Sequence, residues 1–384
     1  MVCDSVIRNF TLSREALFVV SIGAILFFPS LISIIFEVLS IELASYLPVF
    51  FGVMTITLIS FNPEKIRNIR INRNIILLFI FFIYIFSSYL YTQSVIASKE
   101  KLTEIAYNTV LPIILLQSIH YNHLRTSISD SLTSKIFYRI SYISLTLIIL
   151  FFVLFNIQDE SGRYSIKGID NAIWFSRLIA LPTIFLILYF PKPKLNKLFC
   201  LAVISLSCIL LLLGGSRGPI IAILIILFVY YKNKRKSKGN LLAVLSIILF
   251  PILLIASTLN SYVFETNLYS WYARIEIFKL IQHVNFNYIF GEGIGSFGYV
   301  ITGEDVKHYP HNIFVEIFFE FGFIGLLIFS ILVMRFIRGF HFNPINIGCL
   351  FFLIASFVSG DIPGNNNFFI LLYLSFKLEE NKPK

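Results

Sequence analysis

The sequence predicts an all-α, polytopic integral membrane protein with about twelve transmembrane helices. Of its 384 residues, 57% are hydrophobic and only 14% are charged, whereas about a quarter of a soluble domain is charged. The mean hydropathy is +0.83. Apolar runs long enough to cross a bilayer recur from end to end, and the alternation typical of transmembrane β-strands is absent. A soluble enzyme is therefore excluded.

The expected spans follow one another along the whole chain, so residues 1–384 are treated as one membrane domain. The last two are short, and one re-entrant hairpin is the alternative to two full spans. The spans are residues 15–36, 43–61, 75–91, 104–120, 137–156, 172–190, 198–213, 218–231, 240–258, 312–334, 345–359 and 366–377.

Basic residues between the spans predict the orientation. Lys and Arg concentrate in the connections that lie inside when the N-terminus is cytoplasmic, which also places the C-terminus inside. The net charge of +10 therefore reflects topology, and nucleic-acid binding is not expected. We expect a retained first span rather than a signal peptide, because no small-residue cleavage site follows Arg8 and Arg14.

One long outer loop, residues 259–311, separates the ninth and tenth spans. Loops of this length are uncommon unless they are functional. Its segment 268–284 has apolar residues at helical spacing and predicts a helix lying on the membrane surface. The following GEGIGSFG (291–298) formally matches a dinucleotide fingerprint, but no βαβ unit surrounds it, so we interpret it as a turn.

The four cysteines, Cys3, Cys200, Cys208 and Cys349, show no metal-binding spacing, and neither a metal site nor a cofactor is expected. Cys200 and Cys208 lie about 12 Å apart along one predicted helix, too far for a disulfide. All four are interpreted as structural.

Ionisable side chains near the apolar runs are the most informative residues, because each costs about 2.5–3.5 kcal/mol to insert at the centre of a bilayer. On the expected topology they gather at the outer membrane boundary, and no comparable group lies at the membrane centre. The members are Arg177, Arg217, Arg274, His308, His311, Glu316, Glu320 and Asp361.

The arginines and histidines also have structural interpretations. Arg177 has the length to reach the lipid headgroups, and GGSRGP (214–219) forms a tight turn between two helices. Such a turn needs no arginine, so we favour a functional role for Arg217. Asn312 is a good N-cap for the tenth span, which leaves His311 unexplained. His308 alone is interpreted as a loop residue rather than a catalyst.

The acidic residues and glycines of the tenth span favour structural roles. Glu316 and Glu320 lie one turn apart on one helix face, and we expect them to pair with arginines or loop amides. Gly322 and Gly325 are expected to allow close helix packing.

The polar cluster has a chemical interpretation. Several arginines at the outer boundary suit a lipid phosphate or pyrophosphate. A histidine at the same level takes up a proton near neutral pH. Arginines that hold a diphosphate leaving group, together with a base that activates a hydroxyl, indicate glycosyl transfer from a lipid-linked sugar.

Three blocks resemble, in this order, the O-antigen polymerase and O-antigen ligase superfamily: GGSRGP, then WYARIEIFKLI with FGEGIGSFG, then YPHNIFVEIFFEFGFIGLL. The resemblance covers about residues 170–335, and its His-Asn block is the most specific part. It implies a GT-C-like, metal-independent membrane glycosyltransferase. The expected substrates are undecaprenyl-pyrophosphate-linked glycans at the periplasmic face of the bacterial inner membrane.

Residue by residue, the resemblance implies that Arg217 and Arg274 hold the pyrophosphate and that His311 is the base or orients the acceptor hydroxyl. These three are the expected catalytic residues. The expected substrate-binding residues are Arg177, Glu316 and His308.

The GEGIGSFG turn and the YPHN form favour a polymerase, which joins repeat units, over a ligase, which transfers the polymer to lipid A–core. A ligase remains the alternative, because a second histidine stands at 308, although not two residues before the His-Asn pair. A polymerase implies a lipid-linked oligosaccharide as substrate and a chain-length regulator protein as partner. A transporter or flippase is a further alternative, but it would place polar residues at the membrane centre and carry internal repeats. An envelope scaffold protein is another alternative, but it would not explain the arginines at the membrane boundary.

Overall fold

The computed structural model describes residues 34, 72–117, 130–158, 163–167, 169, 171–189, 194–233, 275–276, 279–281 and 283–380. Within these ranges the chain is almost entirely helical, as predicted, and one short β-hairpin departs from the all-α expectation. The expected spans 43–61 and 240–258 lie outside the described residues, as does the span 15–36 apart from Ile34.

Four asparagines begin helices. The side-chain oxygens of Asn72, Asn171, Asn312 and Asn343 accept hydrogen bonds from amides of the first helical turn, as N-caps do. The helices are α4 (Arg73–Ser87), η2 (Ser88–Leu90), α5 (Ile96–Ile105), the π-helical η3 (Ala106–Val110), α6 (Leu111–Gln117), α8 (Asp130–Phe155), α9 (Ala172–Leu188), α10 (Lys194–Leu213), α11 (Arg217–Asn233), α14 (Ser296–Thr302), α15 (Ile313–Arg338), α16 (Pro344–Ser356), η4 (Pro363–Asn365) and α17 (Asn366–Glu380).

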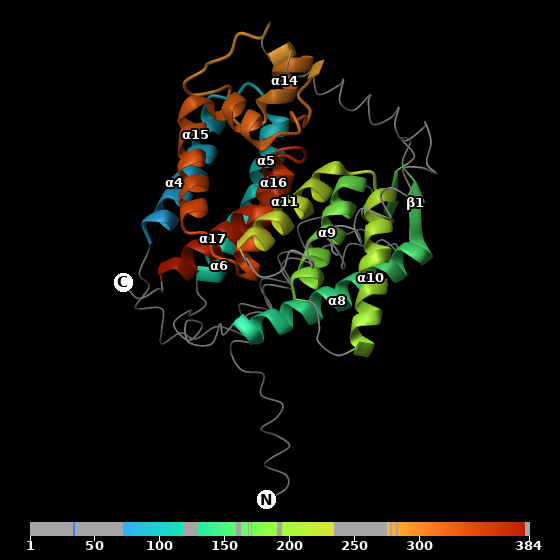
Figure 1. Ribbon diagram of the computed structural model, residues 1–384. Helices are drawn as coiled ribbons and strands as arrows, with labels where there is room; N and C mark the ends of the chain where they lie inside the picture. The colour runs from blue at the N-terminus through green and yellow to red at the C-terminus, as the bar shows by residue number, and fades with distance from the viewer. Residues whose placement is uncertain are drawn as a thin grey trace, which may run out of the picture.

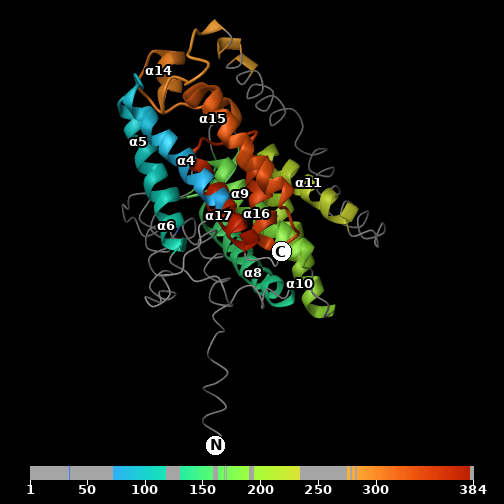
Figure 2. The same cartoon turned by 90° about the vertical axis from the view of Figure 1, so that its left-hand side faces the viewer.

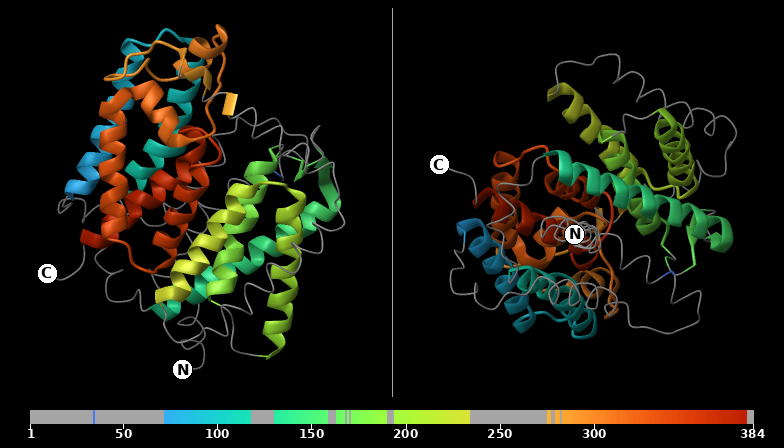
Figure 3. Two further views of the ribbon diagram at one scale, coloured as in Figure 1. Left: turned by 45° about the horizontal axis from the view of Figure 1, so that its top comes forward. Right: turned by 90° about the horizontal axis from the view of Figure 1, so that it is seen from below.

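The helices form two groups that share α16. Helices α8 to α11 make one group, and α4, α15 and α17 make the other, while α16 packs on both α11 and α17 (Figures 1 and 3). Figure 2 shows α14 and α5 at the end of the molecule where α15 begins. Strands β1 (Asn156–Gln158) and β2 (Tyr164–Ile166) pair antiparallel between α8 and α9, with Asn156 opposite Ile166.

Several helices are apolar enough for a membrane. Among the described residues, three stretches have both the length and the composition to cross a bilayer, Arg73–Leu90, Phe137–Phe155 and Ile313–Arg338, although the last is broken at Gly322. Helices α16 and α17 have 13 and 15 residues, which corresponds to about 20 and 22 Å against a hydrocarbon core of about 30 Å. In the outer loop, residues 275–276, 279–281 and 283 are helical. The number of twelve spans stays a prediction.

Helix α15 is broken in its middle. Gly322 has φ 61° and ψ −163°, far from helical values. The rings of Phe314 and Phe329 lie 5.1 Å apart, although a straight helix would separate these positions by about 22 Å. The chain therefore folds back at Gly322, and we call residues 313–321 the first half of α15. The expected role of Gly322 in helix packing is wrong.

The GEGIG segment pairs with this break. Four backbone hydrogen bonds of 2.8–3.3 Å join residues 288–293 to residues 319–324 on either side of Gly322. They satisfy amides and carbonyls that the break leaves without helical partners. A Cβ atom at Gly291 would overlap the backbone of Glu320. The glycines thus serve close backbone approach.

The end of the outer loop also caps α5. The carboxylate of Asp305 accepts hydrogen bonds from the amides of Val95, Ile96 and Ala97 at 2.9, 2.8 and 3.1 Å, and from the hydroxyl of Ser94. Slight burial opposes ionisation, but these hydrogen bonds outweigh it and lower the pKa of Asp305 to about 2.

Replacing Asp305 by alanine is expected to loosen this contact by about 1 kcal/mol at neutral pH, as for a lost N-cap. An unfolded aspartate has a pKa of about 3.9, so the contribution is complete above that pH and is lost as the pH falls towards 2. Limited proteolysis of the loop, measured between pH 5 and pH 2.5, should show acid-induced cleavage in the parent chain and a pH-independent rate in the variant. The adjacent exposed Glu304, replaced by alanine, is the control and should behave as the parent does.

Candidate functional site

A buried ion-pair cluster holds the first half of α15 against α5. The ammonium of Lys101 donates to Oε1 of Glu316 and to Oε1 of Glu320, at 2.6 Å in each case. All three side chains are at most 1% exposed. Burying carboxylates is costly unless they are paired and hydrogen-bonded. The lysine therefore explains how an otherwise apolar segment tolerates two glutamates.

Among the described residues, both glutamates pair with this lysine and not with an arginine, and the backbone amide of Gly295 also hydrogen-bonds Glu320, as expected of a loop amide. The pair Lys101–Glu316 is 215 positions apart in the sequence, so no local pattern joins them. One signal was available: Ala97, Lys101 and Ile105 recur every four residues, and all three lie on the buried face of α5. A lysine at a helix position that the apolar spacing predicts to be buried requires an anionic partner that is buried with it.

Arg177 is buried in the first half of α9, with 2% of its surface exposed. Its guanidinium donates to the side chain of Asn365 at 3.1 Å and to the carbonyl of Ser359 at 2.7 Å. The indole ring of Trp174 stacks on it at 4.7 Å. Arg177 therefore does not extend towards lipid headgroups, and that alternative is wrong. It binds the connection between α16 and α17, residues 357–365.

The His-Asn pair reaches the same connection from the other group of helices. The side-chain amide of Asn312 caps α15 with its oxygen and donates with its nitrogen to the carbonyl of Phe357 at 2.9 Å. His311 precedes it with φ 58° and is the one non-glycine residue of positive φ in the described ranges. Holding a non-glycine residue there costs of order 1–3 kcal/mol, and such strain clusters at functional sites. The ring of Tyr309 lies 4.7 Å from that of His311.

The GGSRGP turn contacts this connection as well. Gly218 lies so close to it that a Cβ atom would overlap the side chain of Val358. Arg217 is the first residue of α11, so its backbone lies beside the connection that Arg177 binds. The side chain of Arg217 is outside the described part of the structure, and so is the whole of Arg274.

Lys307 forms a second ion-pair cluster at the rim of this region. Its ammonium donates to Glu104 at 2.5 Å and lies 3.6 Å from both Glu100 and Asp361. Burial alone would lower the pKa of Lys307, but the carboxylates of Asp361 and Glu104 outweigh it and raise that pKa. The neighbouring His308 is exposed. Lys307, like Lys101, did not figure among the expected site residues.

Tyr309 lies among the charged groups of both clusters. Burial raises the pKa of its hydroxyl, Asp361 and Glu316 raise it further, and Lys307 and Arg177 oppose them. The hydroxyl therefore stays protonated at neutral pH and is able both to donate and to accept a hydrogen bond.

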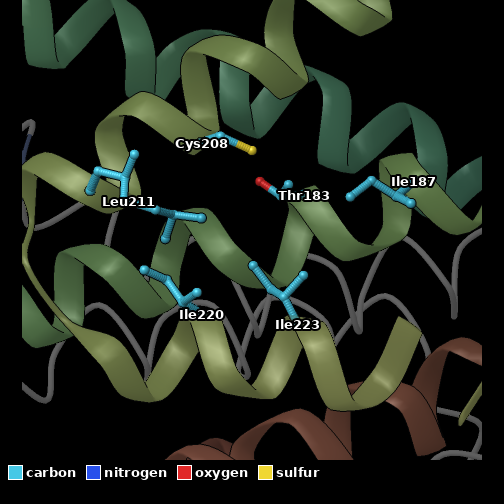
Figure 4. Close-up of a pocket in the computed structure, with 7 residues that line it drawn as sticks. Thr183, Ile187, Cys208, Leu211, Ile220 and Ile223 are labelled. Carbon is cyan, nitrogen blue, oxygen red and sulfur yellow. The ribbon is translucent and has the colours of Figure 1, made fainter. Parts of the chain in front are cut away.

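A recess of about 340 Å³ lies elsewhere, between α9, α10 and α11 (Figure 4). Its lining is apolar apart from the Thr183 hydroxyl and the Cys208 thiol, and the hydroxyl already donates to Ile179. Such a lining has no groups for acid–base chemistry. Cys200, Cys208 and Cys349 are buried free thiols, as expected. In the described ranges no set of three His, Cys, Asp or Glu side chains is arranged to bind a metal.

Comparisons with known proteins show which proteins the chain resembles. Residues 200–330 match the family model described as O-Antigen ligase. The chain is also 28% identical over 135 residues to the O-antigen polymerases of Salmonella typhimurium and Salmonella typhi. The resemblance to the O-antigen polymerase and ligase superfamily is confirmed. The similar stretch covers 34% of this chain and 33% of each relative, so the chain spans about a third of the curated relatives it matches.

The superfamily match includes some parts of the site and omits others. The family model covers the GGSRGP turn, Lys307, His311 and both glutamates, since all lie within residues 200–330. Lys101, Arg177 and Asp361 lie outside it and join the site only through the contacts described above. The site is therefore built from matched superfamily blocks and from elements that flank them.

Proposed function

We propose that this chain is a polymerase of a bacterial surface polysaccharide, O-antigen or a related capsule or exopolysaccharide. It would join undecaprenyl-pyrophosphate-linked repeat units at the periplasmic face of the inner membrane. The observation that supports this most is the meeting of three segments, those of Arg177, Arg217 and His311, at residues 357–365. Cationic and basic groups at one place suit a diphosphate leaving group next to a hydroxyl nucleophile.

The proposed reaction is a single displacement. The terminal hydroxyl of one lipid-linked repeat unit attacks the anomeric carbon of the growing chain, and a ring nitrogen of His311 takes the hydroxyl proton. A new glycosidic bond forms while the bond from the anomeric carbon to the pyrophosphate breaks, and undecaprenyl pyrophosphate leaves with the electron pair. Arg217 and Arg274 stabilise the charge that develops on the departing oxygen. Both substrates are lipids, so the membrane plane adds proximity.

Arg177 has a different part in this proposal. Its terminal nitrogens already donate to the 357–365 connection, and its side chain is buried. With 2% of its surface exposed, Arg177 presents little of its guanidinium to a substrate. We therefore assign Arg177 to positioning the connection, and we assign the binding of the pyrophosphate to Arg217 and Arg274.

A ligase is the second candidate, because the matching family model is described as O-Antigen ligase while the curated relatives are O-antigen polymerases. A deletion strain distinguishes the two by its lipopolysaccharide pattern on a gel. Loss of long chains with one repeat unit still on the core indicates a polymerase. Loss of every repeat unit from the core indicates a ligase, and an unchanged ladder argues against both.

Replacing His311 by asparagine is expected to reduce polymerisation by about 10²- to 10⁴-fold, the usual contribution of a general base. Asparagine tolerates the positive φ at this position, so the change removes the imidazole with little added backbone strain. Product chain length and the amount of inserted protein are measured together. The exposed His283, replaced by asparagine, is the control. Full-length polymer from the His311 variant would remove the base from the mechanism.

A further inference from the structure

The charged side chains around the 357–365 connection separate by sign. On the side of α9 stands Arg177, and the backbone of α11 begins on the same side at Arg217. On the side of α5 stand three carboxylates, Glu100, Glu104 and Asp361, with Lys307 among them. The α5 side therefore carries an excess of negative charge, which would repel a diphosphate.

Asp361 offers an unused acceptor on the α5 side. Its Oδ1 accepts a hydrogen bond from the amide of Gly364 at 2.9 Å. Its Oδ2 is buried and has no hydrogen-bond donor among the described residues, and the ammonium of Lys307 stands 3.6 Å away, beyond hydrogen-bond distance. A buried carboxylate oxygen without a donor is costly, so a donor that the described residues do not supply is expected there, and a sugar hydroxyl is one that fits.

Two aromatic rings lie near Asp361. Trp174 lies so close to Asp361 that a Cβ atom at Gly364 would come within 2.6 Å of both side chains. Tyr309 is within electrostatic reach of Asp361 and Lys307, and both rings are partly exposed. Sugar rings present hydroxyl donors at their edges and apolar C–H groups on their faces. Carboxylates, an ammonium and partly exposed aromatic rings together match both features.

We propose that Glu104, Lys307, Tyr309, Asp361 and Trp174 form a sugar-binding subsite for the acceptor glycan. This inference rests on the proposed function. Carboxylate oxygens accept from sugar hydroxyls, the ammonium of Lys307 donates to a ring or hydroxyl oxygen, and the aromatic rings contact the sugar face. The acceptor sugar then lies on the α5 side and the donor diphosphate on the side of α9 and α11. His311 stands next to Tyr309, where the attacking hydroxyl must arrive.

The binding test uses the purified full-length chain and two separate probes. One is the repeat-unit oligosaccharide released from the polysaccharide of the same cells, and the other is undecaprenyl pyrophosphate. Glu104→Gln and Asp361→Asn are each expected to weaken oligosaccharide binding at least tenfold and to change undecaprenyl pyrophosphate binding less than twofold. The exposed Glu276→Gln is the matched control and should bind both probes as the parent does.

The outcomes separate the two proposals. If the parent chain binds undecaprenyl pyrophosphate but not the oligosaccharide, or if the variants lose both probes equally while still folded, the sugar subsite is wrong and the proposed function stands. If the parent chain binds neither probe, the proposed function fails and the subsite with it. Should Asp361→Asn fail to fold, Glu104→Gln and Lys307→Met decide, because both side chains are partly exposed.

A kinetic measurement assigns the subsite to acceptor or donor. A repeat unit on a phosphonate-linked lipid accepts a chain but cannot donate one, because its phosphonate cannot act as a leaving group. For Glu104→Gln we expect the KM for this acceptor to rise at least tenfold, with the KM for the natural donor within twofold of the parent value. A rise in the donor KM instead would overturn the acceptor assignment.

Discussion

Replacing Lys101 by methionine is expected to have the largest effect of any single change in the described residues. The variant leaves Glu316 and Glu320 buried at 0% side-chain exposure without their cation. Removing one partner of a buried ion pair costs about 3–5 kcal/mol, which is a large part of the 5–15 kcal/mol that separates most folded and unfolded proteins. Inserted protein, thermal stability in detergent and polymer should all fall sharply.

Compensating changes test the reason for that loss. A triple variant, Lys101→Met with Glu316→Gln and Glu320→Gln, contains no buried charge and should recover most of the inserted protein. The exposed Lys99→Met on the same helix is the matched control and should resemble the parent chain. If the triple variant is no more stable than Lys101→Met alone, uncompensated charge is not the cause.

Replacing Gly322 by alanine is the second change with a large expected effect. The backbone at φ 61° and ψ −163° lies in a region that is essentially limited to glycine, so strain alone costs of order 1–3 kcal/mol. The new methyl group would also overlap the Ile289 carbonyl and come within 2.6 Å of the Gly291 amide nitrogen. We expect the pairing of the 288–293 segment with the helix break to be lost, together with polymer formation. Protease cleavage near residue 290 measures that loss.

Gly303 provides the control for backbone strain. It also has a positive φ, 78°, but a Cβ atom there would meet nothing within 4 Å. Gly303→Ala therefore carries conformational strain of about 1–2 kcal/mol without an overlap. The Gly303 variant should keep its polymer and its protease resistance. Equal damage in both variants would mean that the close approach of the two backbones is unimportant.

Much of the helical architecture is predictable from the sequence alone. The expected spans 172–190, 198–213 and 345–359 correspond to α9, α10 and α16 within a few residues. Apolar periodicity and N-cap asparagines are local signals, and a helix is built from local hydrogen bonds. The superfamily blocks are likewise local, which is why the resemblance was detectable before any contact was known.

The sequence signals were weaker where the chain departs from a regular helix. The tenth expected span was assigned as one helix, because its residues are apolar throughout. Gly322 alone did not reveal the break, since glycine also occurs where helices pack closely. The break depends on a distant segment, 288–293, whose amides and carbonyls pair with it.

The sequence alone thus predicted a helical membrane protein that resembles the O-antigen polymerase and ligase superfamily and has polar residues near its His-Asn block. Only the tertiary structure decided their partners: Lys101 for the glutamates, the 357–365 connection for Arg177, and Asp361 for Lys307. The physical reason is the separation along the sequence between the groups that interact. Helices arise from neighbours along the chain, whereas buried charges select partners in space, and those partners lie up to 219 positions away.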